Sequence, residues 1–185
     1  MTNRFFAVIL LLFLVGCNSA TNTPSLPTSP APTDVFSPVL DISGYADLEI
    51  TMERTICFGT CPAYTLKIFG NGTGVYEGKG SVKVEGIQNF TLTRGQLDEL
   101  VKAFETANYF SFKDYYSVAA TDLPSTMTSI TFQGHAKAVE HYGYCLDYEH
   151  IDIPEDSPQT AAPQTLCDLE DEIDKIVNTK RWTGK

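Results

Sequence analysis

An unbroken apolar run from Phe5 to Val15 divides this chain of 185 residues into a leader and the part that is left to fold. Arg4 precedes the run, and Gly16 and Cys17 follow it. A transmembrane helix needs about 20 apolar residues, so the run is too short to span a bilayer in the mature protein. Because it is typical of the core of a secretory signal, residues 1–16 are predicted to be a signal peptide.

Cys17 ends the sequence Leu14-Val15-Gly16-Cys17, which resembles a bacterial lipobox. The resemblance implies cleavage before Cys17 and acylation of that cysteine. Acyl chains hold a protein at a membrane because each buried methylene contributes about 0.8 kcal/mol. We therefore expect a bacterial lipoprotein, anchored to a membrane of the cell envelope on its extracytoplasmic side.

Residues 17–44 form the lipidated N-terminus and a segment rich in proline, threonine and serine. This segment has few large apolar side chains with which to build a core, so we expect a flexible tether. Polyproline-like chain rises about 3.1 Å per residue, which would let the tether reach up to about 75 Å from the bilayer. The remaining residues, 45–185, have the length of one globular domain.

Alternating apolar and polar residues predict strands over residues 47–53 and 62–69. The pair Asn71-Gly72 then favours a hairpin, because both residues tolerate positive φ. Further strands are predicted at 81–84 and 89–92, with a turn between them. The first half of the domain should therefore be an antiparallel meander.

A capping box at Thr93 and Gln96 predicts a helix that ends near Asn108. A second hairpin is expected around Gly134, and a final helix should open near Thr165. Together the elements predict an α+β fold: an antiparallel β-sheet, made of the meander plus the hairpin, with two helices packed on one face.

The domain holds four cysteines, Cys57, Cys61, Cys145 and Cys167. An even number in an extracytoplasmic domain indicates disulfide bonds, and four cysteines allow three pairings. We favour Cys57–Cys61 and Cys145–Cys167. Gly59 permits the turn that the first pair requires, and the second pair would close an acidic insertion, 145–167, that has no core of its own.

Thiol redox chemistry and metal binding are alternative roles for the cysteines. The pair Cys57 and Cys61 is spaced C-x3-C and precedes a strand, whereas a reactive thiol usually lies at a helix N-terminus or beside a cation. A metal site would combine this pair with His135, His141 or Cys145. The site that we predict holds no metal and no cofactor. Weak calcium binding by the acidic insertion stays open, although the insertion lacks an EF-hand pattern.

A net charge of −10 argues against binding of nucleic acid and against docking onto anionic lipid headgroups. The sequence contains no nucleophile elbow, zinc-protease motif, phosphate-binding loop or dinucleotide fingerprint. It therefore nominates no catalytic residue, and an interaction domain is favoured over an enzyme.

One loop is a candidate contact for a partner or ligand. The stretch from Tyr115 to Thr126 is long for a connection between a helix and a strand, and such loops are often functional. An Asx-type turn at Asp122 is the structural alternative. The candidate contact residues are Tyr115, Tyr116, Thr121, Asp122 and Thr126.

The sequence Cys57-Phe58-Gly59-Thr60-Cys61-Pro62-Ala63-Tyr64 resembles the C-F-G-T-C-P-x-Y motif of an uncharacterised bacterial family of small exported domains. The likeness continues through Asn71-Gly72-Thr73 and closes at Arg181-Trp182. The acidic insertion departs from the family pattern. Because the family has no assigned activity, the resemblance implies no catalytic residue.

The sequence thus predicts a lipid-anchored domain of the bacterial cell envelope that binds another component. The membrane is reached through the anchor, and the expected partner is an envelope protein or a glycan. The alternative function is a thiol-redox or metal-handling envelope lipoprotein.

Overall fold

The computed structural model describes residues 44–143 and 161–185. Its elements, in chain order, are β1 (Glu49–Arg54), β2 (Ala63–Phe69), β3 (Thr73–Gly80), β4 (Gly86–Thr91), α1 (Arg94–Thr106), the 3-10 turn η1 (Tyr109–Ser111), β5 (Tyr115–Ser117), β6 (Ser125–Phe132), β7 (His135–Tyr142), α2 (Gln164–Val177) and α3 (Lys180–Thr183). Cys17, the leader, the predicted tether and Cys145 lie outside the described residues.

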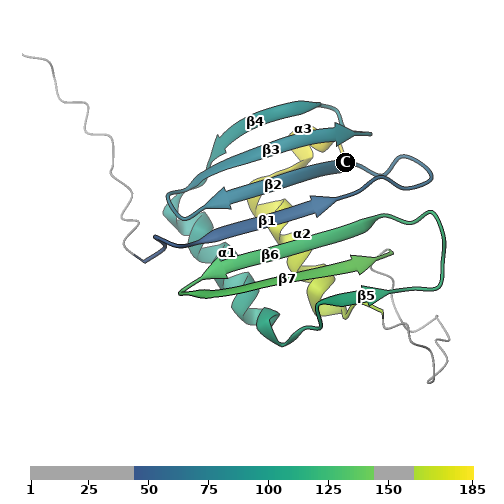
Figure 1. The fold of residues 1–185 in the computed structure, drawn as a ribbon. Helices are drawn as coiled ribbons and strands as arrows, with labels where there is room; N and C mark the ends of the chain where they lie inside the picture. Colours follow the sequence, from purple (N-terminus) through teal and green to yellow (C-terminus); the bar gives the residue numbers. More distant parts are fainter. Residues whose placement is uncertain (1–43, 144–160) are drawn as a thin grey trace, which may run out of the picture. The chain divides into compact units, whose positions relative to one another are not determined.

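The strands form one seven-stranded sheet in the order β4-β3-β2-β1-β6-β7-β5. All neighbouring strands are antiparallel except β5, which runs parallel to β7. The helices lie together on one face of this sheet (Figure 1). The predicted α+β class, with a meander, a hairpin and helices on one face, is confirmed.

The core lies between the sheet and the helices. Alternate residues of β1 and β2 point into it, because successive side chains of a strand face opposite sides. Helix α1 begins with the predicted capping box: Gln96 N–H donates to Thr93 Oγ1, and Thr93 N–H donates to Gln96 Oε1. The buried apolar residues of the two long helices are Leu97, Leu100, Val101 and Phe104 in α1, and Leu166, Leu169, Ile173, Ile176 and Val177 in α2.

One predicted strand is absent. Residues 81–84 form a bend, in which Ser81 adopts a left-handed φ of 52°. The backbone of this bend pairs with the C-terminal helix: Val84 N–H donates to the Trp182 carbonyl (2.9 Å), and Lys83 N–H donates to that of Thr183 (3.3 Å). The sequence pattern missed this because the acceptors lie a hundred residues away along the chain.

The connection predicted from Tyr115 to Thr126 is shorter in the structure, because strands occupy both of its ends. Tyr115 begins β5 and Thr126 lies in β6, so the connection itself spans residues 118–124. Strand β5 has only 3 residues. A strand this short carries little periodicity, which explains why the sequence did not reveal it.

Candidate functional site

A pocket of about 590 Å³ opens where β1 ends, β2 begins and α2 gives way to α3. Two local features lie here: the pairing of β2 with β3 shifts register between Ala63 and Tyr64, and Asn178 ends α2 in the left-handed conformation. The side chains that matter here are Arg54, Tyr64, Asp174, Asn178, Lys180 and Lys185.

Arg54, Tyr64 and Asp174 form the floor of the pocket. The Tyr64 hydroxyl donates to Asp174 Oδ1 (2.5 Å), and Arg54 donates from Nε (3.2 Å) and Nη2 (3.0 Å) to Asp174 Oδ2. The Thr179 hydroxyl also donates to Asp174 Oδ1 (2.7 Å). The carboxylate of Asp174 is therefore saturated by protein donors, and it fixes the C-terminal half of α2 against β1 and β2.

The electrostatics of this floor keep Arg54 and Tyr64 each in one protonation state. Burial lowers the pKa of Arg54, but Tyr64, Asp174 and Glu170 outweigh burial and raise the pKa overall. Burial raises the pKa of the Tyr64 phenol, and the charge of Asp174 raises it further. Arg54 is thus a permanent cation, and Tyr64 is a permanent hydrogen-bond donor.

A fully buried carboxylate lies behind the floor. Glu170 is 0 % exposed, and its Oε2 lies 2.9 Å from Nε2 of the buried His141 and 3.7 Å from Nη1 of Arg54. The Thr128 hydroxyl donates to Oε1 (3.2 Å). Glu170 therefore contacts Arg54 on β1, at the centre of the sheet, and His141 on β7, near its edge. These contacts join both strands to α2.

Within the part of the chain that the structure describes, the imidazole of His141 has a carboxylate as its hydrogen-bond partner. His141 is buried, and its ring contacts Glu170. Among the described residues, no serine or threonine hydroxyl and no thiol forms a hydrogen bond with that ring. The polar floor is instead a fixed set of donors and charges beneath an open pocket.

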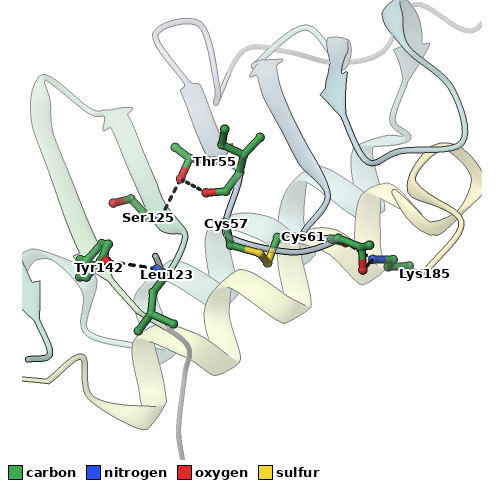
Figure 2. Close-up of a disulfide and its surroundings, with 9 residues drawn as sticks. Thr55, Cys57, Cys61, Leu123, Ser125, Tyr142 and Lys185 are labelled. Carbon is green, nitrogen blue, oxygen red and sulfur yellow. Dashed lines mark hydrogen bonds between the residues drawn. A yellow bond between two sulfur atoms is a disulfide. The ribbon is translucent and has the colours of Figure 1, made fainter. Parts of the chain in front are cut away.

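The connection between β1 and β2 forms one rim of the pocket, and we call residues 55–61 the stapled loop. Cys57 and Cys61 are joined by a disulfide with their Cα atoms 5.6 Å apart, which is the first pairing predicted from the sequence. Figure 2 shows this bond between Ser125 and Leu123 on one side and Lys185 on the other. Cys61 itself lines the pocket.

Hydrogen bonds to the neighbouring connection hold the stapled loop in place. Thr55 N–H donates to the Ser125 carbonyl (3.0 Å), and Ser125 N–H donates back to Thr55 Oγ1 (2.8 Å). Phe58 N–H donates to the Asp122 carbonyl (2.9 Å). The two loops, which are far apart in sequence, therefore form one rigid rim.

The tip of the stapled loop is apolar and exposed. Phe58 is 91 % exposed and Ile56 is 69 % exposed. Lys185 donates from Nζ to the carbonyl and hydroxyl oxygens of Thr60 at the foot of the loop. An apolar tip thus stands beside a cation that no described carboxylate neutralises.

The predicted contact residues of the second loop separate into two groups. Tyr115, Thr121 and Asp122 are exposed. Tyr116 is buried and its hydroxyl accepts from Lys113 N–H (2.9 Å), while Thr126 is buried and accepts from Arg54. Thr126 also lines the pocket beside Arg54, whereas Tyr116 does not.

The residues proposed for a metal site lie apart. Cys57 and Cys61 are oxidised, His141 faces Glu170, and the ring of His135 packs edge-on against Phe110. The described part of the chain holds no group of three potential metal ligands. Cys167 is buried and disulfide-bonded, but Cys145 lies outside the described residues, so the second pairing stays a prediction.

The floor of the pocket, Arg54, Tyr64 and Asp174, was not predicted from the sequence, although the sequence contains a pattern that indicates it. Every second residue of a strand faces the same side of the sheet. Arg54 follows the buried Ile50 and Met52 at this spacing, so its side chain lies on the core face of β1. On α2, Glu170 lies in the buried stripe, and Asp174, four residues further on, is half-buried beside it. Charged residues at core positions of two elements indicate a buried pair.

Fold and site together define a disulfide-stapled α+β domain with a pocket that charged side chains border and no recognisable catalytic set among its described residues. The chain belongs to the family described as "Domain of unknown function (DUF6438)", which it matches over residues 48–177. This agrees with the resemblance to a family without an assigned activity. No curated protein matches the chain. None of the described helices combines the length and apolar character that a bilayer crossing requires.

Proposed function

We propose that this protein is a lipid-anchored interaction domain of the bacterial cell envelope, which binds an envelope protein or glycan in the pocket beside Arg54. The observation that carries the proposal is the pocket itself. Its volume of about 590 Å³ lies in the range of ligand sites, which is roughly 300–1,000 Å³.

The floor of the pocket supports binding because it is already ordered. Asp174 receives hydrogen bonds from Tyr64, Arg54 and Thr179, so none of these side chains must be immobilised when a ligand arrives. Ordering of side chains is a main cost of association, and a fixed floor avoids it. On the rim, Asn178 offers a neutral amide and Lys180 offers a charged ammonium group to a ligand.

The location in the envelope is supported by the leader and by the cysteines. The lipobox that ends at Cys17 implies export and acylation. The bond between Cys57 and Cys61 is typical of an oxidising compartment outside the cytoplasm. Intact-mass spectrometry of the protein from its native host tests this part, since a chain that retains residues 1–16 would contradict it.

Site-specific photo-crosslinking tests the pocket. A photoreactive side chain replaces Lys180 on the rim, or Asn89, an exposed residue of β4, as the matched control. In living cells we expect position 180 to capture one recurrent envelope component that position 89 does not. Glycan-digesting enzymes then decide whether that component is a glycan or a protein. Equal capture at the two positions would contradict a pocket-specific partner.

A charge reversal provides a second readout. Lys180 makes no ion pair within residues 44–143 and 161–185, so Lys180→Glu should leave the unfolding midpoint unchanged. The same change should weaken capture by a crosslinker at position 175, which lines the same pocket. Loss of capture without loss of stability separates a binding role from a structural one.

A further inference from the structure

We propose that the stapled loop is a membrane-contact element, whose apolar tip, Ile56 and Phe58, enters the interfacial region of a phospholipid bilayer while Lys185 lies among the headgroups. This inference rests on the lipid anchor of the proposed function. It assigns a lipid surface as the partner of Ile56 and Phe58, which belong to the rim of the pocket but do not line it.

The exposure of the tip is the first observation. Phe58 is 91 % exposed and Ile56 is 69 % exposed, and both belong to the same short loop. Single exposed apolar residues are ordinary, but two large ones on one projecting loop mark a contact surface. Aromatic and aliphatic side chains on a polar background are also what interfacial elements insert into the headgroup boundary.

The rigidity of the loop is the second observation. The disulfide between Cys57 and Cys61 closes the loop, and Phe58 N–H donates to the Asp122 carbonyl. Thr55 is held by two further hydrogen bonds to Ser125. Because the backbone is fixed on both sides, the tip cannot fold back onto the domain to cover its apolar side chains.

Charge around the loop is the third observation. Lys185 Nζ binds the carbonyl and hydroxyl oxygens of Thr60, which are neutral, and Lys180 has no ion pair in the described part of the chain. Lysine stems can lie along an apolar layer while their ammonium groups reach phosphate. Asp122 and Asp171 are acidic and exposed at the same end, so apolar insertion has to supply most of the attraction.

The net charge of −10 argued against a headgroup surface for the domain as a whole. An anchor changes this balance, because a tethered domain meets the bilayer at a high effective concentration. One weak membrane signal gives marginal binding, whereas two signals together give stable attachment. The tip of the stapled loop would be the second signal beside the acylated Cys17.

Depth-dependent quenching tests the proposal with the lipidated, full-length protein in vesicles of phosphatidylethanolamine and phosphatidylglycerol. Phe58→Trp places a fluorophore at the tip, and Ile87→Trp places one at an apolar residue of β4 that is 65 % exposed. Both variants keep the buried Trp182 as an identical background. With brominated acyl chains we expect loss of most of the added emission at position 58 and almost none at position 87.

The outcomes are distinct. Selective quenching at position 58 supports the proposal. Equal quenching at both positions, or none at either, overturns it, because the first shows indiscriminate proximity and the second shows no contact. If position 58 is not quenched in protein-free vesicles but crosslinks to a protein in cells, the tip binds protein instead. Crosslinking at position 175, which lines the pocket and has no part in the membrane proposal, reports on the pocket separately, so either proposal can fail alone.

A charge variant adds a second measurement. Lys180→Gln combined with Lys185→Gln in the Phe58→Trp background should reduce quenching in these vesicles. Lys102→Gln, an exposed change on α1, should leave quenching unaltered. Reduction by both changes alike would contradict a local role for the two lysines.

Discussion

The Tyr64 hydroxyl on β2 donates a 2.5 Å hydrogen bond to Asp174 on α2, and Arg54 Nε lies within hydrogen-bond distance of both groups. This triangle joins two strands and a helix at the floor of the pocket. Because the groups are partly or fully withdrawn from water, removal of one leaves the others without compensation.

Replacement of Arg54 by methionine should lower the free energy of unfolding by about 3 kcal/mol. The change leaves Asp174 and the buried Glu170 as carboxylates without their shared cation. Urea denaturation measures it. Lys67→Met removes an exposed partner of Glu49 and should cost no more than about 1 kcal/mol, so equal effects would contradict a special role for Arg54.

Alkaline pH should unfold the protein. Burial and the charge of Asp174 raise the pKa of Tyr64, so the folded state keeps a proton that an unfolded tyrosine loses near pH ~10. The stabilisation is complete below that pH, and the free energy of unfolding falls as pH rises above it. Tyrosinate absorbance should therefore appear together with unfolding. Tyr64→Phe should flatten this dependence, whereas Tyr115→Phe, at an exposed position, should not.

Loss of the disulfide should loosen the stapled loop without disrupting the sheet. In the chain-entropy model, replacing Cys57 and Cys61 by serine costs about 2 kcal/mol for so short a loop. Hydrogen exchange of the Phe58 amide, which is bonded to Asp122, should accelerate more than that of Ile50 in β1. Uniform acceleration of both amides would show that the bond supports the whole domain.

Replacement of Gly70 and of Gly95 by alanine should change the stability of the protein in opposite directions. A Cβ at Gly70 would lie 1.7 Å from the Tyr45 carbonyl oxygen, so the backbone must shift and stability should fall by at least about 1–3 kcal/mol. Gly95 lies in α1, where its nearest neighbour would be Thr93 Oγ1 at 3.9 Å. Gly95→Ala should raise stability by about 0.5–1 kcal/mol, because alanine favours helix. Thermal unfolding of both variants checks the signs.

The pairing of Cys145 with Cys167 can be tested by peptide mapping without reduction. Cys167 is buried in α2, and we expect its disulfide-linked peptide to contain Cys145. Cys145→Ser should then increase protease cleavage within the acidic insertion while the sheet keeps its unfolding midpoint. A link from Cys167 to Cys57 would overturn both pairings. Thiol titration of the purified protein before and after a mild reductant, together with metal analysis, separately tests the redox or metal-handling alternative. Four oxidised, slowly reducible cysteines and no bound metal would contradict that alternative.

The elements that the sequence predicted well are those with local signals. The capping box at Thr93 and the hairpin at Asn71-Gly72 depend on residues next to each other in the chain. The bend at residues 81–84 was missed because its hydrogen-bond partners are the carbonyls of Trp182 and Thr183. No window of neighbouring residues contains that information.

The candidate site was predicted only in part for the same reason. The stapled loop follows from the spacing of Cys57 and Cys61, but the floor of the pocket needs Arg54 on β1 to meet Asp174 on α2. A charged residue in phase with a buried face shows that a partner exists. Only the packing of the helix on the sheet identifies the partner.

The bonds from the connection at residues 81–84 to the end of α3 bear on how the domain is made. Trp182 stacks on Tyr76, so a side chain of α3 completes a cluster that β3 begins much earlier in the chain. Until α2 and α3 have left the ribosome, part of the apolar face of the sheet is uncovered. The core of the domain therefore closes only after α3 has been synthesised.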